Sequence, residues 1–230
     1  MLLHPIATFR SPFPSKFGIP KQSGLVEELR GEIVFLPQYR QADYIRGLEE
    51  FDYLWLLWEF SANPHRATSP VVRPPVLGGN ERVGVFATRS PFRPNPLGLS
   101  SVRLDRIELS TPHGPVIHVL GADLMDGTPI YDIKPYVVYA DSHPEARSGF
   151  VDRRTWAKLR VEIPDSVTAL FSAEQLATLR HTLELDPRPH YQNDATKVYG
   201  MPFCGHDIHF TVSDGVLTVM DIPSVSSSST

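Results

Sequence analysis

The chain of 230 residues contains a single cysteine, so no disulfide can form within it, and a lone thiol is typical of proteins in reducing compartments. It also lacks a long hydrophobic run, because the longest apolar stretch, near residues 54–58, is far shorter than the roughly 20 residues that span a bilayer. The N-terminus lacks a basic start followed by an apolar stretch, so we expect no signal peptide. These absences predict a cytoplasmic protein with no membrane partner.

The usual fingerprints of nucleotide-binding enzymes are missing as well. The chain has no G-x-G-x-x-G turn, no Walker lysine loop and no G-x-S-x-G nucleophile elbow. It has no excess of positive charge either, since its net charge is −4. Cationic side chains nevertheless gather over residues 73–106 and 147–160, and such local patches either bind phosphate groups or simply face solvent.

Long helices are scarce, whereas proline is abundant at 22 residues. Alternating apolar residues and turn signals predict strands over residues 5–10, 31–36, 51–60, 83–88, 101–109 and 116–120. One or two helical turns are expected over 41–48. The aromatic run at 51–60 predicts a strand buried on both faces, with Trp55 and Trp58 on opposite sides, either as core or as a wall for a base. The fold class is therefore mainly β, a barrel or sandwich, over residues 1–150.

A polar, charged segment at 141–154 indicates a boundary, and the pattern after it differs. Residues 151–230 predict a small α+β domain with a frayed, serine-rich tail. A strand is expected over 156–163, and Ser172 with Gln175 predicts a capping box at the start of a helix. Ser213-Asp214-Gly215 predicts a hairpin between strands at 208–212 and 216–219.

Residues 83–100 are the stretch most suggestive of a site. Pro91, Pro94 and Pro96 remove backbone donors and disfavour helix, so they predict a stiff, extended loop after a strand. The loop carries the polar side chains Arg89, Arg93 and Asn95. A stiff loop loses little entropy when it binds a ligand, although a proline-rich connector with solvated arginines would look the same.

A second polar group follows the turn at Asp126-Gly127. Asp132, Lys134 and Tyr136 alternate and so share one face, where they make a hydrogen-bonding set for a polar substrate or a simple ion pair on a strand. The carboxylates around this turn lack the spacing of a calcium-binding loop.

Cys204, His206 and His209 invite a metal interpretation. On a strand, however, His206 and His209 point to opposite faces, and no second thiol lies nearby. We therefore predict no metal site.

Several motifs together resemble the TsaA-like (TrmO) family. They are VGVFATRSPFRPNPLG at 83–98, VRPP at 72–75 with GGN at 78–80, KQSGL at 21–25, DGTP at 126–129 and DIKPY at 132–136. The segment LDPRPHY at 185–191 resembles the signature of the C-terminal module in bacterial members. The similarity extends over nearly the whole chain.

This resemblance implies a TsaA-like β-barrel enzyme that uses S-adenosylmethionine to methylate tRNA at the exocyclic amine of threonylcarbamoyl-adenosine, next to the anticodon. It also implies a homodimer with the site near the interface. By position in the family, the residues expected to line the cofactor are Gln22, Ser23, Gly24, Ser61, Ala62, Arg89, Leu99, Asp123, Leu124, Met125, Asp126 and Gly127. Family members often carry a histidine where this chain has Ser61 and Ala62, which leaves the main chain to make that contact.

The chemistry of this implied reaction suggests a second set of residues for the substrate side. Asp132 is the candidate acceptor for the amine proton, and the candidates to grip the carboxylate, base edge or phosphates are Arg93, Asn95, Lys134 and Tyr136. The C-terminal module, with Arg188, His190 and Tyr191, is a predicted tRNA contact. Two other classes remain open: a protein that binds S-adenosylmethionine or tRNA without turnover, and a phosphate-handling hydrolase built on the arginine loop.

Overall fold

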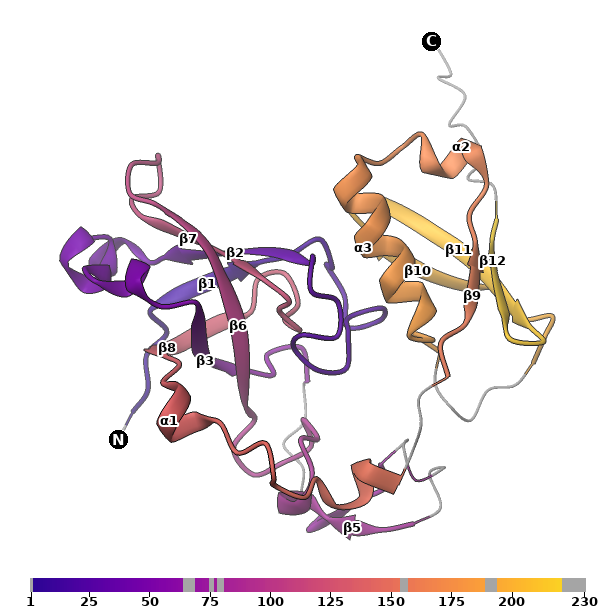
Figure 1. Ribbon diagram of the computed structural model, residues 1–230, viewed down its shortest axis with the longest axis horizontal. Helices are drawn as coiled ribbons and strands as arrows, with labels where there is room; N and C mark the ends of the chain where they lie inside the picture. The colour runs from indigo at the N-terminus through magenta and orange to yellow at the C-terminus, as the bar shows by residue number, and fades with distance from the viewer. Residues whose placement is uncertain are drawn as a thin grey trace.

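Six strands close into a barrel in the order β1-β2-β7-β6-β3-β8 (Figure 1). The computed structural model describes residues 2–63, 69–74, 77, 81–153, 157–188 and 194–220. The barrel strands are β1 (Ala7–Arg10), β2 (Arg30–Phe35), β3 (Tyr53–Glu59), β6 (Leu97–Glu108), β7 (Val116–Leu120) and β8 (Pro129–Pro135). All of their pairings are antiparallel. The predicted mainly β barrel is confirmed.

Burial along β3 alternates, so its prediction as a strand buried on both faces was wrong. Leu54, Leu56 and Trp58 point into the barrel, while Trp55 and Leu57 are half-buried on the outside. An antiparallel barrel has one packed face and one face toward solvent, and the apolar run of β3 contributes to both. The opposite orientation of Trp55 and Trp58 is confirmed.

The strand expected over 83–88 is much shorter than predicted. β5 (Val83–Gly84) pairs only with β4 (Val71–Val72), and a 3-10 turn η5 (Val85–Ala87) follows at once. Because β4 offers only two residues for pairing, the strand ends and the chain turns after Gly84. The turn is closed by the Thr88 backbone N–H and Oγ1, which both donate to the Val85 carbonyl, at 3.1 and 2.8 Å. The loop after it is irregular up to Pro96, as its prolines predict, but residues 97–100 belong to strand β6 and not to the loop expected there. Much of the loop expected over 63–80 lies outside the described residues.

The remaining elements of the N-terminal part are short. Three 3-10 turns, η1 (Pro37–Tyr39), η2 (Ala42–Ile45) and η3 (Leu48–Glu50), follow β2, and of these η2 lies within the range 41–48 predicted to form helical turns. After the barrel come α1 (Val138–Asp141) and η6 (Gly149–Arg153), which lead toward the C-terminal part (Figure 1).

The C-terminal part is a four-stranded sheet with a helix against it (Figure 1). Its elements are β9 (Arg160–Glu162), α2 (Asp165–Thr168), α3 (Ala173–Glu184), β10 (Tyr199–Phe203), β11 (His206–Ser213) and β12 (Val216–Val219). The predicted capping box of Ser172 and Gln175 is present, and the predicted hairpin is β11–β12. The expected strand from Trp156 begins only at Arg160, and Trp156 itself lies outside the described residues. No helix in the described part of the chain is long and apolar enough to cross a membrane.

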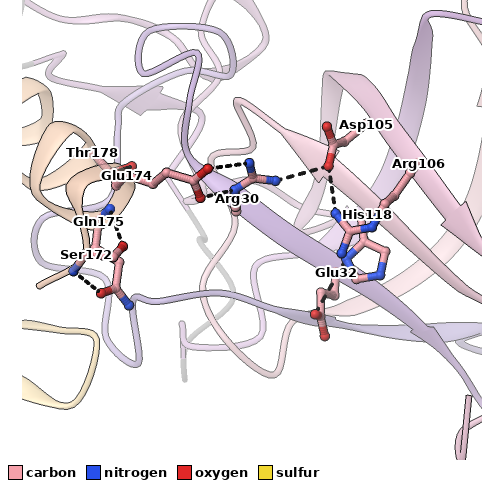
Figure 2. A network of polar contacts seen from close by, with 9 residues as sticks. All are labelled: Arg30, Glu32, Asp105, Arg106, His118, Ser172, Glu174, Gln175 and Thr178. Atoms are coloured by element: carbon pink, nitrogen blue, oxygen red, sulfur yellow. Dashed lines mark hydrogen bonds and ion pairs between the residues drawn. The ribbon is translucent and has the colours of Figure 1, made fainter.

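The loop between β1 and β2 joins the two parts. Phe13, Val26 and Leu29 leave the barrel and are buried in the same core as α3 and the C-terminal sheet. At the edge of this contact the Arg30 guanidinium bridges Glu174 of α3, at 2.9 Å, and Asp105 of β6, at 3.1 Å (Figure 2). Burying three such side chains contributes roughly 1.5–3 kcal/mol each, whereas an exposed ion pair contributes about 1 kcal/mol or less. Apolar packing therefore holds the C-terminal part in place. The division into 1–150 and 151–230 stays our proposal.

Candidate active site

A pocket of about 550 Å³ opens beside the end of β3. Four segments meet there: the β1–β2 loop, the end of β3 with the residues after it, the proline-rich loop leading into β6, and the segment between β7 and β8. The lining residues are Lys16, Ile19, Pro20, Lys21, Gln22, Trp55, Trp58, Glu59, Phe60, Ser61, Ala62, Asn63, Thr88, Arg89, Pro91, Arg93, Leu97, Gly98, Leu99, Asp123, Met125 and Thr128.

A chain of hydrogen bonds crosses the pocket floor. The Trp58 Nε1–H donates to Ser100 Oγ at 2.9 Å, and the Ser100 hydroxyl donates to Asp123 Oδ1 at 2.5 Å. The indole reaches this position because it lies flat against Gly98, its register partner on β6, where an added Cβ would be only 2.3 Å from the ring. Because Gly98 has no side chain, the Trp58 indole can occupy this position and reach Ser100.

Asp123 is the carboxylate most altered by this setting. Burial raises the pKa of Asp123 above its ordinary value, while the hydrogen bond from Ser100, the main chain of Ser23 and the Arg89 charge act in the opposite direction. The Ser23–Gly24 turn is held next to it, since the Gly24 N–H donates to the Gly121 carbonyl at 2.8 Å. A carboxylate kept in a partly desolvated wall is a strong acceptor for a cationic or hydroxyl-bearing ligand.

The proline-rich loop that leads into β6 carries Arg89 and Arg93 and is also called the arginine loop. Its two guanidinium groups make different contacts. Arg89 Nη1 donates to Gln22 Oε1 at 2.5 Å and so connects the proline-rich loop with the β1–β2 loop across the pocket. Arg93 Nη1 donates to the Thr88 and Ser90 carbonyls at 3.1 and 3.3 Å, and it thereby folds its own loop. Arg89 is the exposed cation of the two, while Arg93 is half-buried.

The residues after β3 form the opposite wall. Tyr131 donates to Glu59 Oε2 at 2.5 Å, and this bond raises the pKa of Tyr131 to about 12. Lys16 Nζ donates to the Ala62 carbonyl at 2.9 Å and to Asn63 Oδ1 at 2.6 Å. The Asn63 amide nitrogen is buried and has no hydrogen-bond partner among the residues the structure describes. That wall therefore offers one donor that is not used within the described chain.

Eight of the predicted site residues line the pocket. They are Gln22, Ser61, Ala62, Arg89, Arg93, Leu99, Asp123 and Met125. Other predicted cofactor residues lie outside the lining: Leu124 is buried in the barrel core, and the Asp126 carboxylate accepts a hydrogen bond from the Ser11 N–H at 3.0 Å. Gly127 has a positive φ of 77° at the turn before β8, which favours glycine. Asn95 is exposed on the loop outside the lining.

Asp132, Lys134 and Tyr136 lie on the outer face of β8 and just beyond its end, outside the lining. Lys134 Nζ and Asp132 Oδ2 form an ion pair at 2.9 Å, so the simple pair weighed from the sequence is present. The Tyr136 ring packs on Trp55, with 5.8 Å between centroids, and Trp55 does line the pocket. This polar set is therefore adjacent to the pocket and connected to it through Trp55.

Sequence reasoning missed several lining residues. Glu59 and Lys16 were not singled out, whereas Trp58, which was weighed both as core and as a wall for a base, is buried and also lines the pocket. The KQSGL motif was the one signal for the β1–β2 loop, and it stops short of Lys16. In the Cys204, His206 and His209 group, Cys204 lies in a turn with a φ of 48°. No group of three potential metal ligands occurs among the described residues.

Comparison with known proteins agrees with this geometry. The tRNA-methyltransferase O N-terminal domain matches residues 8–142, and the C-terminal domain of the same family matches residues 157–225. The chain is 41% identical over 218 residues to a tRNA (adenine(37)-N6)-methyltransferase of Escherichia coli, covering 91% of this chain and 92% of that protein. It is 37% identical over 213 residues to a putative S-adenosylmethionine-dependent methyltransferase of Pseudomonas aeruginosa, covering 90% of each. The crystal structure of TrmO from Pseudomonas aeruginosa superposes with a TM-score of 0.75 at 31% identity, covering 96% of this chain and 97% of that one.

The closed antiparallel barrel, in a chain without a dinucleotide fingerprint, is therefore shared with a solved TrmO structure. The chain belongs to the tRNA-methyltransferase O family. This membership confirms the predicted enzyme class, an S-adenosylmethionine-dependent tRNA methyltransferase.

Proposed function

We propose that this protein methylates the exocyclic amine of threonylcarbamoyl-adenosine next to the anticodon of tRNA, with S-adenosylmethionine as methyl donor in the pocket beside β3. The observation that supports it most is the meeting of Asp123, Arg89 and Gln22 in one pocket, because the three come from segments far apart in the chain. The cytoplasmic location expected from the sequence is part of the proposal, since tRNA is the substrate.

The residues present suit S-adenosylmethionine. The polar groups of the pocket are of several kinds. The Asp123 and Glu59 carboxylates complement cationic and hydroxyl groups, and the Arg89 guanidinium complements a carboxylate. The buried Asn63 amide offers a hydrogen-bond donor. Trp58 and Phe60, whose rings are 4.4 Å apart, provide an apolar wall for a purine. Family members often carry a histidine where this chain has Ser61 and Ala62. Here the Ala62 carbonyl accepts a hydrogen bond from Lys16 Nζ, so this main-chain group is fixed in position.

The chemistry demands little covalent participation from the protein. S-adenosylmethionine, when bound, supplies a methyl group that its sulfonium already activates. The protein's contribution is to hold the target nitrogen in line and to accept its proton, for which Asp132 is the candidate. Lys134, Arg93, Asn95 and Tyr136 are the candidates to hold the threonyl carboxylate, the base edge or phosphates.

Two further predictions belong to the proposal. The first is that the C-terminal module contacts tRNA. In its LDPRPHY signature, the Arg188 guanidinium donates two hydrogen bonds to the Asp186 carboxylate, at 2.8 and 2.9 Å. His190 and Tyr191 of this signature lie outside the described residues. A homodimer is supported by the exposed Phe86 and Phe92 on the arginine loop, since such side chains are enriched at interfaces.

The test compares tRNA that carries threonylcarbamoyl-adenosine with the same tRNA lacking the modification. Labelled S-adenosylmethionine is supplied, and the product nucleosides are identified by mass spectrometry. Methylation restricted to the modified tRNA supports the proposal, whereas equal methylation of both contradicts the assigned substrate. Calorimetry with Arg89→Ala tests the cofactor site: we expect about ten-fold weaker S-adenosylmethionine binding, as for a lost charged hydrogen bond, with Arg46→Ala as a control away from the pocket.

A further inference from the structure

An aromatic surface continues from the pocket onto the outside of the barrel. Tyr53 and Trp55 occupy alternate, outward positions of β3, so both belong to the solvent face. Tyr53 is opposite Arg103 on β6, and Trp55 is opposite Lys134 on β8. The Tyr136 N–H donates to the Tyr53 carbonyl at 2.9 Å, which brings the Tyr136 ring alongside the other two.

The three rings form one connected row. The centroids of Tyr53 and Tyr136 are 6.1 Å apart, and those of Tyr136 and Trp55 are 5.8 Å apart. Trp55 lines the pocket at one end, while Tyr53 is 44% exposed at the other. We call Tyr53, Trp55 and Tyr136 the aromatic platform. A ligand that leaves the pocket on this side meets aromatic faces at once.

Charged side chains are interspersed with these rings. Arg103 is exposed beside Tyr53, and the Lys134–Asp132 pair is beside Trp55. Aromatic side chains combined with cations are the recurrent means of binding unpaired nucleotides, because every base has a face that stacks and every linkage has a phosphate. A protein–protein interface, in contrast, is depleted of Lys and Asp at its centre, whereas here Lys134 and Asp132 both lie beside Trp55. The mixture therefore favours RNA over a second copy of this chain.

We propose that the aromatic platform stacks an unpaired base of the tRNA that adjoins the target adenosine, with Arg103 pairing to a nearby phosphate. The inference rests on the proposed position of the target adenosine at this pocket. It gives Tyr53 and Trp55 a positioning role that the family resemblance did not assign. Stacking of the neighbouring base keeps the target nucleotide unstacked from it, and so directs the target into the pocket.

The experiment compares tRNA affinities of protein variants and tRNA variants in a double-mutant cycle, under conditions in which no methyl transfer takes place. Fluorescence anisotropy measures the Kd of tRNA for the full chain, using tRNA that is intact or that has an abasic nucleotide on either side of the target adenosine. We expect one abasic position to weaken binding to the parent protein by about 5-fold to 100-fold, the range for loss of one stacked base. Tyr53→Ala should weaken binding of intact tRNA similarly and make that abasic substitution nearly without effect. Tyr53→Phe, which keeps the ring, should bind as the parent does.

Tyr44→Ala is the matched control, since Tyr44 is 62% exposed on η2 and contacts only the edge of Tyr39 among the ring contacts described. It should leave the Kd for tRNA unchanged. In parallel, Arg103→Ala should reduce the slope of log Kd against log salt by about 1, as for one lost phosphate contact.

Two results would overturn the inference. If each abasic substitution weakens Tyr53→Ala as much as the parent, the base does not stack there. If light scattering shows that Tyr53→Ala converts a dimer into monomers, the face belongs to a second copy. Because the cycle measures binding alone, it is independent of whether threonylcarbamoyl-adenosine is the methylated nucleoside, which the methylation test decides separately.

Discussion

The Ser100 hydroxyl donates to the Asp123 carboxylate at 2.5 Å and is itself held by the Trp58 indole at 2.9 Å. Ser100 is 2% exposed, so one strand of the barrel supplies the only side-chain donor that the described residues direct at this carboxylate. The bond offsets part of the desolvation of Asp123 but does not cancel it, because the pKa of Asp123 remains raised. The pocket thus keeps an acceptor at a cost in stability.

The first prediction concerns that cost. Because the pKa of Asp123 is higher in the folded than in the unfolded chain, its contribution to stability is greatest below the unfolded value and is lost as pH rises through the folded value. Asp123→Asn should therefore gain stability relative to the parent as pH rises from the ordinary pKa of an aspartate, about 3.9, through the raised folded value. It should also bind S-adenosylmethionine about ten-fold or more weakly, through loss of a charged acceptor.

Urea unfolding at several pH values and calorimetry provide the two readouts. Asp52→Asn is the control, since Asp52 is exposed and lies outside the pocket lining. A stability difference between Asp123→Asn and the parent that does not change with pH would contradict the raised pKa.

The second prediction concerns the close approach of Trp58 to Gly98. In Gly98→Ala the new methyl would meet the indole at 2.3 Å, so the ring must move and release Ser100. We expect a loss of about 1–3 kcal/mol in the free energy of unfolding and weaker cofactor binding. Gly84→Ala is the matched control, because nothing described lies within 4 Å of its added Cβ. Equal unfolding free energies for the two variants would show that the barrel adapts to the methyl without cost.

The third prediction separates the apolar and ionic contributions to the contact between the two parts. Leu29 is 2% exposed in the C-terminal core, so Leu29→Ala should lose about 2–5 kcal/mol. Glu174→Gln, which removes one of the two charged partners of Arg30 at the surface, should lose less than about 1 kcal/mol. Leu25→Ala, at a position of the same loop that is 49% exposed, should be nearly neutral. Denaturant unfolding measures all three, and a larger loss in Glu174→Gln than in Leu29→Ala would reverse the ranking.

The same loop also carries Gln22, so the C-terminal core, which packs on this loop, supports the pocket indirectly. We therefore expect Leu29→Ala to weaken S-adenosylmethionine binding, although none of the described residues after Thr128 lines the pocket. Truncating the chain near residue 150 would expose Phe13, Val26 and Leu29 and would not be a clean test of tRNA contact.

Local patterns were enough to predict the features that depend on neighbours in the chain. The Ser172–Gln175 capping box, the β11–β12 hairpin and the irregular arginine loop all follow from adjacent residues. What the sequence did not reveal depends on long-range packing. The Trp58–Ser100–Asp123 chain joins three strands or loops, and its existence depends on the β3–β6 register and on the missing side chain at Gly98. Likewise, apolar residues of the β1–β2 loop gave no sign that they belong to the core of a sheet more than a hundred residues away.

The fourth prediction concerns recognition of the threonyl carboxylate, and it starts from the ion pair between Lys134 and Asp132. Lys134 is 72% exposed in its side chain, so the pair itself contributes little to stability, and the ammonium is accessible to a second carboxylate. A site that holds a charged group leaves its own charge unpaired when that group is missing, which penalises the wrong substrate. Single-turnover methylation by the parent should therefore be much faster on tRNA with threonylcarbamoyl-adenosine than on tRNA without it.

Lys134→Ala should lose most of this preference together with most of the rate on modified tRNA, and Lys134→Arg should restore part of both because the charge is kept. Lys158→Ala serves as the control, since Lys158 is also exposed and paired with a carboxylate, Glu184 at 3.4 Å, but in the C-terminal part. Asp132→Asn should slow methyl transfer while leaving tRNA affinity nearly intact, because its proposed role is at the amine proton rather than in binding. If Lys134→Ala keeps the parent's preference, the carboxylate is recognised elsewhere; if Asp132→Asn keeps the parent's rate, positioning alone accounts for the chemistry.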